Sequence, residues 1–254
     1  MIVDTHLHWP MSSDNSPQPL LDTLDATGIA AAVVSGLEVL FARTSATARH
    51  WNDRLMAFCD QEAARLIPLV TVHLSEGQSA LDEAKRCLGT GRVGGFKLHP
   101  WLQGESLRLP ATAELCGLAA QSGLPVMLHD GTPPYSLCSQ IGLLAGEHPR
   151  TTFILGHSGL LQYWREAAAV GSSLDNVYLT LCGGHLWGMQ RICQAVPTQR
   201  LLWGSDCLGP GNEEIIRYRL GLADLLGLDP ASHQATMGGN ARRLWSTWSQ
   251  RVKP

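Results

Sequence analysis

The chain opens with the stretch Ile2-Val3-Asp4-Thr5-His6-Leu7-His8. In an extended strand successive side chains alternate between the two faces, so Asp4, His6 and His8 point the same way. Two neutral imidazoles can then offer one ring nitrogen each to a single divalent ion, an arrangement that suits zinc and similar metals. Two histidines at a strand end can equally be satisfied by ordinary hydrogen bonds. Further potential ligands at the ends of later strands would favour the metal site over the hydrogen-bonded alternative.

Short apolar runs rich in β-branched residues recur along the chain, and the gaps between them carry helical periodicity. The predicted strands are residues 2–6, 30–35, 67–72, 93–98, 125–128, 152–156, 176–181 and 200–204. The predicted helices are residues 47–65, 79–88, 111–121, 136–147, 160–169, 186–195 and 213–226. This alternation predicts the α/β class and a closed (β/α)8 TIM barrel. The alternative, a doubly wound sheet, usually stops at about five or six strands.

The chain shows no linker rich in Ser, Gly or Pro, so residues 1–254 are predicted to form one TIM-barrel domain. The tail at residues 237–245 predicts a C-terminal closing helix capped by Asn240.

Composition narrows the classes of function. Hydrophobic residues make up 44% of the chain and charged residues 16%, which is typical of a folded globular protein. The net charge of −3 and the scattered basic residues argue against nucleic acid and anionic membranes as partners. The sequence has neither a signal-peptide pattern nor a membrane-spanning run, which predicts a cytoplasmic protein. Its seven cysteines lack a Cys-x-x-Cys pair, so we expect mostly buried, reduced thiols.

Reactive residues close most of the predicted strands. In TIM barrels the chemistry occupies the carboxyl ends of the strands. The ionisable residues that close successive runs here are His6 and His8, His73, Lys97 with His99, His129, His157 and Asp206. A convergent set of imidazoles and one carboxylate on a rigid scaffold is what a hydrolytic metal site requires.

Several of these strand ends resemble successive signatures of the amidohydrolase superfamily. They are Ile2-Val3-Asp4-Thr5-His6-Leu7-His8, Gly95-Phe96-Lys97-Leu98-His99-Pro100, Pro125-Val126-Met127-Leu128-His129, Ile154-Leu155-Gly156-His157-Ser158-Gly159 and Leu202-Trp203-Gly204-Ser205-Asp206. The similarity is greatest to the branch typified by aminocarboxymuconate-semialdehyde decarboxylase, and it runs from the first strand to the last helix. The resemblance is specific for the superfamily but gives almost no information about the substrate.

The resemblance implies a role for each matching residue. His6, His8, His129 and Asp206 would hold one divalent ion, with His157 as an acid or base beside it. In binuclear branches His157 would bind a second ion. The resemblance therefore implies one or two divalent ions, first of all zinc, with manganese as the alternative.

Lys97 has two readings. Binuclear branches carry a carboxylated lysine on the fourth strand, and Lys97 lies there with a parity that faces the barrel. Burial beside a dication would favour the neutral amine, which could take up carbon dioxide and bridge two metals. Otherwise Lys97 is an ammonium that pairs with a carboxylate.

Other residues just after strands are candidates for binding a small-molecule substrate. They are His99, Trp9, Trp101, His73 and His185. Aromatic and imidazole rings there could line a substrate pocket, although simple packing explains each equally well.

These observations predict a metal-dependent hydrolase that attacks an amide, lactone or ester-like bond with metal-activated water. The catalytic residues would be Asp206, His157 and Lys97. The alternative on the same site is non-oxidative decarboxylation of an unsaturated or aromatic acid. A barrel that binds metal or ligand without catalysis is disfavoured by the complete ligand set. The exposed helices of a barrel could also pack against a second copy of the chain, so the sequence is compatible with a homo-oligomer.

Overall fold

The computed structural model describes residues 1–11 and 15–249 and confirms the α/β class and the TIM barrel. All eight predicted strands are present, with ends that differ by a few residues. The strands are β1 (Ile2–Trp9), β2 (Ile29–Gly36), β3 (Leu66–Val70), β4 (Gly95–Leu98), β5 (Val126–Leu128), β6 (Phe153–Leu155), β7 (Val177–Leu181), β8 (Leu201–Trp203) and β9 (Cys207–Leu208). Every pair of neighbouring strands is parallel.

The short strand β9 closes the barrel and was not predicted from the sequence. β8 pairs with β7, and the chain then continues into β9, where Cys207 pairs with Leu7 of β1. Between the two segments, Thr5 donates a hydrogen bond from Oγ1 to the Trp203 carbonyl at 2.8 Å. The last strand therefore bends across to the first one.

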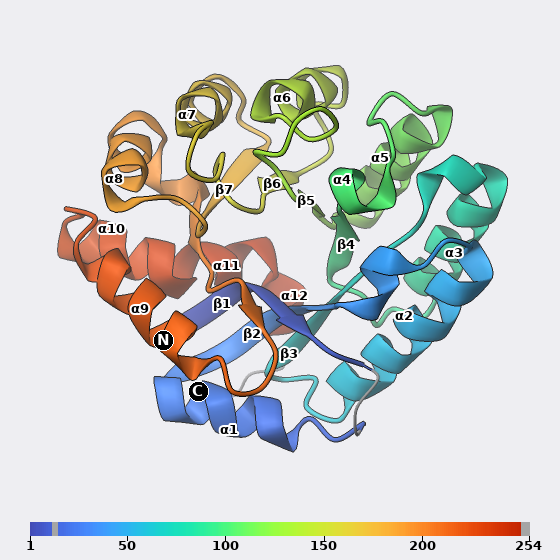
Figure 1. The fold of residues 1–254 in the computed structure, drawn as a ribbon, viewed down its shortest axis with the longest axis horizontal. Coiled ribbons are helices and arrows are strands. Elements are labelled where there is room, and N and C mark those ends of the chain that lie inside the picture. Colours follow the sequence, from blue (N-terminus) through green and yellow to red (C-terminus); the bar gives the residue numbers. More distant parts are fainter. Residues whose placement is uncertain (12–14, 250–254) are drawn as a thin grey trace.

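Helices form an outer ring around the strands (Figure 1). The longer ones are α1 (Gln18–Thr27), α2 (Ser45–Asp60), α3 (Gln78–Gly89), α5 (Pro110–Ser122), α6 (Cys138–Glu147), α7 (Trp164–Ser173), α8 (Leu186–Ala195) and α9 (Glu213–Asp224). The shorter ones are η1 (Glu38–Phe41), η2 (Leu74–Glu76), α4 (Pro100–Gln103), η3 (Thr198–Arg200), α10 (Pro230–Gln234), η4 (Ala235–Gly239), α11 (Asn240–Leu244) and α12 (Ser246–Ser249).

Two helices differ from the prediction for local backbone reasons. Helix α1 was missed because prolines flank its start, yet a proline in the first helical turn lacks only an N–H that the helix does not use. Helix α7 begins at Trp164 instead of residue 160. Ser158 and Leu160 have φ angles of 53° and 52°, which lie outside the right-handed helical region.

The strands separate two layers of apolar side chains. Outward-facing residues such as Phe96, Leu128 and Phe153 pack under the helices in the larger core. Inward-facing residues such as Met127 and Ile154 fill the barrel in a second, smaller core. Lys97 pairs in register with Met127, so its side chain also enters the barrel. This alternation is what carries the polar strand ends to one central site.

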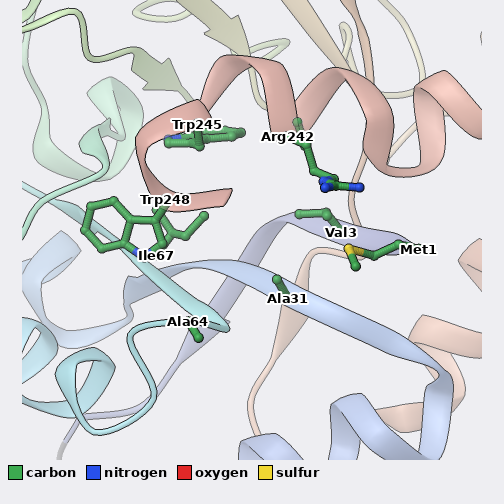
Figure 2. A pocket seen from close by; sticks show the side chains of 9 residues that line it. Met1, Val3, Ala31, Ala64, Ile67, Arg242, Trp245 and Trp248 are labelled. Carbon is green, nitrogen blue, oxygen red and sulfur yellow. The ribbon is translucent and has the colours of Figure 1, made fainter. Parts of the chain in front are cut away.

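The closing helix covers the amino end of the barrel, opposite the strand ends that carry the polar residues. Figure 2 shows Trp245 and Trp248 beside Val3, Ala31 and Ile67 in a small apolar pocket. Trp245 donates a hydrogen bond from Nε1 to the Gly94 carbonyl at 2.8 Å. The prediction of a C-terminal closing helix is therefore confirmed.

Asn240 does not cap that helix as predicted. It lies within the helical run, where Gly239 is the residue before the first turn of α11. Its side-chain Nδ2 donates instead to the carbonyls of Thr198 and Leu201, at 2.6 and 2.7 Å. The asparagine thus ties the closing helix to the start of β8.

Among the described residues, no helix is long and apolar enough to cross a membrane. The seven cysteines are free thiols, and all except the half-buried Cys193 are buried, as predicted.

Candidate metal centre

Three predicted ligands converge at the carboxyl end of the barrel. His6 Nε2 and His8 Nε2 lie 3.1 Å apart. Asp206 Oδ1 lies 3.6 Å from each of these nitrogens. These three atoms, which we call the donor cluster, combine two imidazole nitrogens with one carboxylate oxygen. That is a ligand set that zinc and similar divalent ions accept.

The outer nitrogens of both rings are already engaged. His6 Nδ1 is 2.7 Å from the Gly156 carbonyl oxygen, which can only accept, so Nδ1 carries the proton. His8 Nδ1 is 2.9 Å from Ser35 Oγ. Such outer hydrogen bonds fix the tautomer and the ring orientation of metal-binding histidines. His6 Nε2 therefore carries a lone pair, which faces His8 Nε2 and the Lys97 amine. The donor cluster fits a divalent ion.

Burial keeps the two histidines in the neutral form that binds metal. It lowers the pKa of His6 and of His8 well below the usual range, and the nearby Lys97 charge lowers both further. Burial also raises the pKa of Asp206, while the positive charge of Lys97 lowers it. Neutral imidazoles beside a partly buried carboxylate offer the deprotonated donors that a divalent ion needs.

The position of Asp206 depends on the closure of the barrel. Its backbone N–H donates to the His6 carbonyl at 2.8 Å, and its φ angle of 57° lies in the left-handed region. The preceding Ser205 is held by Asp4, whose Oδ1 also accepts from the His6 N–H at 3.1 Å. Burial raises the pKa of Asp4 to about 6. Asp4 thus joins the predicted ligand His6 in β1 to the segment after β8 that carries the predicted ligand Asp206.

Lys97 lies within the barrel next to the donor cluster. Its Nζ is 2.9 Å from His6 Nε2, and the side chain is fully buried. Burial lowers the pKa of Lys97 to about 8, although the charge of Asp206 opposes the shift. The amine therefore contacts an imidazole of the donor cluster. Carboxylation and charge pairing both remain predictions.

The two later histidines form a separate relay beside the donor cluster. His157 Nε2 lies 2.8 Å from His129 Nδ1, and His129 Nε2 lies 2.8 Å from Thr132 Oγ1. His157 Nδ1 is 3.9 Å from Asp206 Oδ2. Within the described part of the chain, His129 is not among the grouped metal donors, because its nitrogens face His157 and Thr132. Its predicted role as a ligand remains a prediction.

A pocket opens above these residues, and we call it the cup. His8, His99, His129, His157 and Asp206 form its floor, and the His99 and His129 rings stack with centroids 3.8 Å apart. Its walls are apolar. They are formed by Leu37, Leu40, Phe41, Leu102 and Leu208.

A family comparison shows which family the chain belongs to. The amidohydrolase family model matches residues 3–247, nearly the whole chain. The chain belongs to the amidohydrolase family. A comparison with curated proteins gave no significant match.

Solved structures share the fold of this amidohydrolase. The 2,6-dihydroxybenzoate decarboxylase from Rhizobium has a TM-score of 0.74 at 18% identity, covering 97% of this chain and 98% of that one. The 5-carboxyvanillate decarboxylase from Sphingomonas paucimobilis has a TM-score of 0.72 at 14% identity, covering 96% and 98%. A dihydroxybenzoic acid decarboxylase from a Polaromonas species, solved with bound manganese and 2-nitroresorcinol, has a TM-score of 0.74 at 14% identity, covering 96% of each chain.

Four residues predicted to bind substrate lie outside the cup of this amidohydrolase. Trp9 packs into the outer core, because successive side chains along β1 alternate between its two faces and Trp9 lies on the face opposite to His8. Trp101 is half exposed, and its neighbour Leu102 lines the cup instead. His73 Nε2 is 3.2 Å from the Val39 carbonyl oxygen, and His185 Nδ1 accepts from the Gly188 N–H at the start of α8. Of the five candidates, His99 alone lines the cup.

Sequence reasoning missed the residues that orient the site of this amidohydrolase. Asp130 accepts hydrogen bonds from the N–H groups of His157 and Gly159, at 2.6 and 2.5 Å. Ser35, Thr132 and Asp4 support the rings and the barrel closure described above. Asp130 directly follows a strand-end histidine, which is a detectable signal, whereas Ser35 and Thr132 carry none.

Proposed function

We propose that this amidohydrolase is a metal-dependent decarboxylase of an aromatic or unsaturated carboxylic acid. The observation that carries the proposal is the cup, in which apolar walls stand over a floor of imidazoles and one carboxylate. Such a pocket suits a flat, apolar body that presents a single polar group to its floor. The names of the structural relatives, which are decarboxylases of aromatic acids, support the same reading.

The reaction exchanges carbon dioxide for a proton. The bond between the substrate carbon and its carboxylate breaks, the electron pair stays on that carbon, and a proton then forms the new C–H bond. A divalent ion such as zinc or manganese, held by the donor cluster, would supply positive charge that binds the acid and draws electrons from it. The protein must orient the acid and deliver the proton.

His157 is positioned to handle that proton. It lies on the floor of the cup, and its Nε2 is 2.8 Å from His129 Nδ1. Thr132 extends this chain of polar atoms by one further hydrogen bond, at 2.8 Å. A proton given up to the substrate by His157 can therefore be replaced along the relay.

Lys97 and Asp206 contribute the charges at the floor of the cup. The Lys97 amine, 2.9 Å from His6 Nε2, adds positive charge where the carboxylate of the substrate would enter. Asp206 Oδ2, 3.9 Å from His157 Nδ1, adds negative charge beside that ring. A substrate that fills the cup would displace water from this floor, which strengthens each of these electrostatic interactions.

Hydrolysis, the first prediction from the sequence, is the competing reaction on the same site. Both reactions can be followed in one experiment in deuterium oxide. The zinc-loaded and manganese-loaded proteins are each incubated with hydroxybenzoates, aminobenzoates and unsaturated acids, and with lactones and amides. We expect released carbon dioxide and one deuterium on the carbon that carried the carboxylate.

The two reactions leave different products. Cleavage of a lactone or amide without carbon dioxide and without a C–D bond would overturn the decarboxylase proposal in favour of hydrolysis. His157→Asn should abolish the incorporation of deuterium, whereas the exposed His50→Asn should retain it. A protein that binds metal but turns over neither group of compounds would contradict both proposals.

A further inference from the structure

One apolar wall of the cup stands on an anchored helical turn. Leu37 and Leu40 lie three residues apart at the start of η1, and a 3-10 helix repeats every three residues, so both side chains share the face that lines the cup. Val39 and Ala42 lie on another face and pack in a separate apolar cluster. The Leu37 N–H donates to the Trp9 carbonyl at 3.3 Å, which ties η1 to the end of β1. This wall is therefore preformed.

Two further segments complete the walls. Leu102 belongs to α4, where Gln103 Oε1 accepts a hydrogen bond from the His99 N–H at 2.8 Å. Leu208 of β9 pairs in register with His8, so it lies beside a residue of the donor cluster. The polar residues that line the cup come from β1 and from the ends of four other strands, whereas the wall residues come from η1, α4 and β9 with apolar side chains alone.

Two of the wall side chains are more than half exposed. Phe41 is 57% exposed and Leu208 is 52% exposed, although both line the cup. Burial of such apolar surface by a bound molecule is favourable, because it removes the surface from water. A substrate that reaches both side chains therefore gains affinity from its own apolar part.

The cup has room for more than one ring. Its volume is 240 Å³, whereas an apolar cavity of about 150 Å³ is enough to hold benzene. An aromatic acid whose carboxylate lies at the floor thus leaves space beside the walls for a substituent at its other end.

The walls distinguish between polar and apolar substituents. A hydroxyl or a second carboxylate placed there would lose hydrogen bonds to water and would meet only leucine and phenylalanine side chains. Such a loss without a new partner is unfavourable, whereas burial of an alkyl group is favourable.

We propose that the acid bound in the cup carries an alkyl or alkenyl substituent at the end far from its carboxylate, and that Phe41 and Leu208 select for this substituent. The inference rests on the proposed function, because it places the carboxylate at the floor. It predicts a substrate unlike 5-carboxyvanillate, the acid named for one structural relative, which carries further oxygen substituents on its ring.

A homologous series of acids tests the inference by binding alone. The zinc-loaded full-length protein is titrated in a calorimeter with benzoate and with 4-methyl-, 4-ethyl- and 4-propylbenzoate. Each methylene that becomes buried should raise the affinity about fourfold. 4-(Hydroxymethyl)benzoate, which has nearly the size of 4-ethylbenzoate, should bind about tenfold more weakly than that compound.

Variants assign the preference to the two wall residues. Phe41→Ala and Leu208→Ala should each reduce the gain in affinity along the series. Leu143→Ala, which shortens a similarly exposed side chain of α6 outside the cup, should retain it. Leu208→Ser should narrow the difference between 4-ethylbenzoate and 4-(hydroxymethyl)benzoate, because the new hydroxyl can accept or donate a hydrogen bond.

The outcomes separate this inference from the decarboxylase proposal. Equal affinities along the series in the wild type, or a gain that persists unchanged in both cup variants, would overturn the inference. Release of carbon dioxide from hydroxylated acids without any gain along the series would refute the inference and leave the decarboxylase proposal standing. A gain along the series without released carbon dioxide would support the preference of the cup and count against decarboxylation. If a variant does not fold, the wild-type series and the hydroxymethyl comparison decide.

Discussion

Ser205, directly after β8, donates two hydrogen bonds to Asp4 in β1, from Oγ to Oδ2 at 2.6 Å and from its N–H to Oδ1 at 3.0 Å. The two residues are 201 positions apart in the sequence and are both fully buried. They join β1 to the end of β8 at the point where the predicted ligands His6 and Asp206 lie. This pair therefore contributes both to closure of the barrel and to the geometry of the donor cluster.

Asp4→Ala should destabilise the fold strongly. It leaves three buried donors without their acceptor, namely the N–H of His6 and the N–H and hydroxyl of Ser205. Each unsatisfied buried donor costs about 1–3 kcal/mol, so we expect a loss of about 3 kcal/mol or more in the free energy of unfolding. Urea unfolding measures this loss, with the exposed Asp82→Ala as the control. A loss below about 1 kcal/mol would show that the Asp4 contacts are dispensable.

Ser35→Ala should weaken metal binding while leaving the fold intact. The substitution removes the partner of His8 Nδ1, which lies 2.9 Å from Ser35 Oγ. Loss of such an outer contact typically lowers metal affinity about 10- to 100-fold. Competition with a fluorescent zinc chelator measures the affinity, and the exposed Ser172→Ala serves as the control. Unchanged affinity in Ser35→Ala would mean that packing alone orients His8.

Metal-free protein should lose stability as the pH falls below 6.5. Burial lowers the pKa of His99 from 6.5 to about 3, so between these values the unfolded chain takes up a proton that the folded chain does not. The contribution of His99 is thus fully present above pH 6.5 and is lost progressively toward pH 3, at about 1 kcal/mol per pH unit. Urea midpoints measured with chelator present should shift accordingly. His99→Gln should make this dependence shallower by one proton per chain, because buried histidines such as His129 also have lowered pKa values and remain. An unchanged slope in that variant, or a shallower one in the exposed His50→Gln control, would contradict the assignment.

Lys97→Met should tighten metal binding at pH 7. With its pKa lowered to about 8, the buried amine is mostly charged at that pH and repels a cation at His6 Nε2, 2.9 Å away. Removal of this charge should raise the affinity about tenfold or more. Wild-type affinity should rise from pH 7 to pH 9 as the ammonium loses its proton, and the variant should show less of this rise. The exposed Lys85→Met is the matched control.

The opposite result would indicate that Lys97 is carboxylated and is not a charged amine. Weaker metal binding in Lys97→Met, together with a carboxyl-group mass increase on the wild-type lysine, would indicate a carboxylated bridge between two ions. Chelator titration and native mass spectrometry on the same samples distinguish the two outcomes.

The barrel could be read from the sequence because its strands are nearly continuous apolar runs with a period that differs from that of the helices. The ends of α7 could not be predicted from the sequence, because Ser158 and Leu160, which have left-handed backbone conformations, interrupt a stretch with helical periodicity. Strand β9 has two residues, too few for any periodic signal. Trp9 was proposed for the pocket from its position in the chain, but alternation along β1 turns its side chain into the outer core.

The sequence by itself determined the fold class and the face of the barrel that carries the polar residues, whereas the assignment of His6, His8 and Asp206 as ligands was implied by the family resemblance. The fold class and the polar face follow from local periodicity and from the rule that parallel strands bring their carboxyl ends together. Only the tertiary structure decided that His129 pairs with His157, that Lys97 touches His6, and that Cys182 lies behind the same ring. Each of these contacts joins residues from different strands, and their distances depend on the bend, twist and closure of the whole barrel.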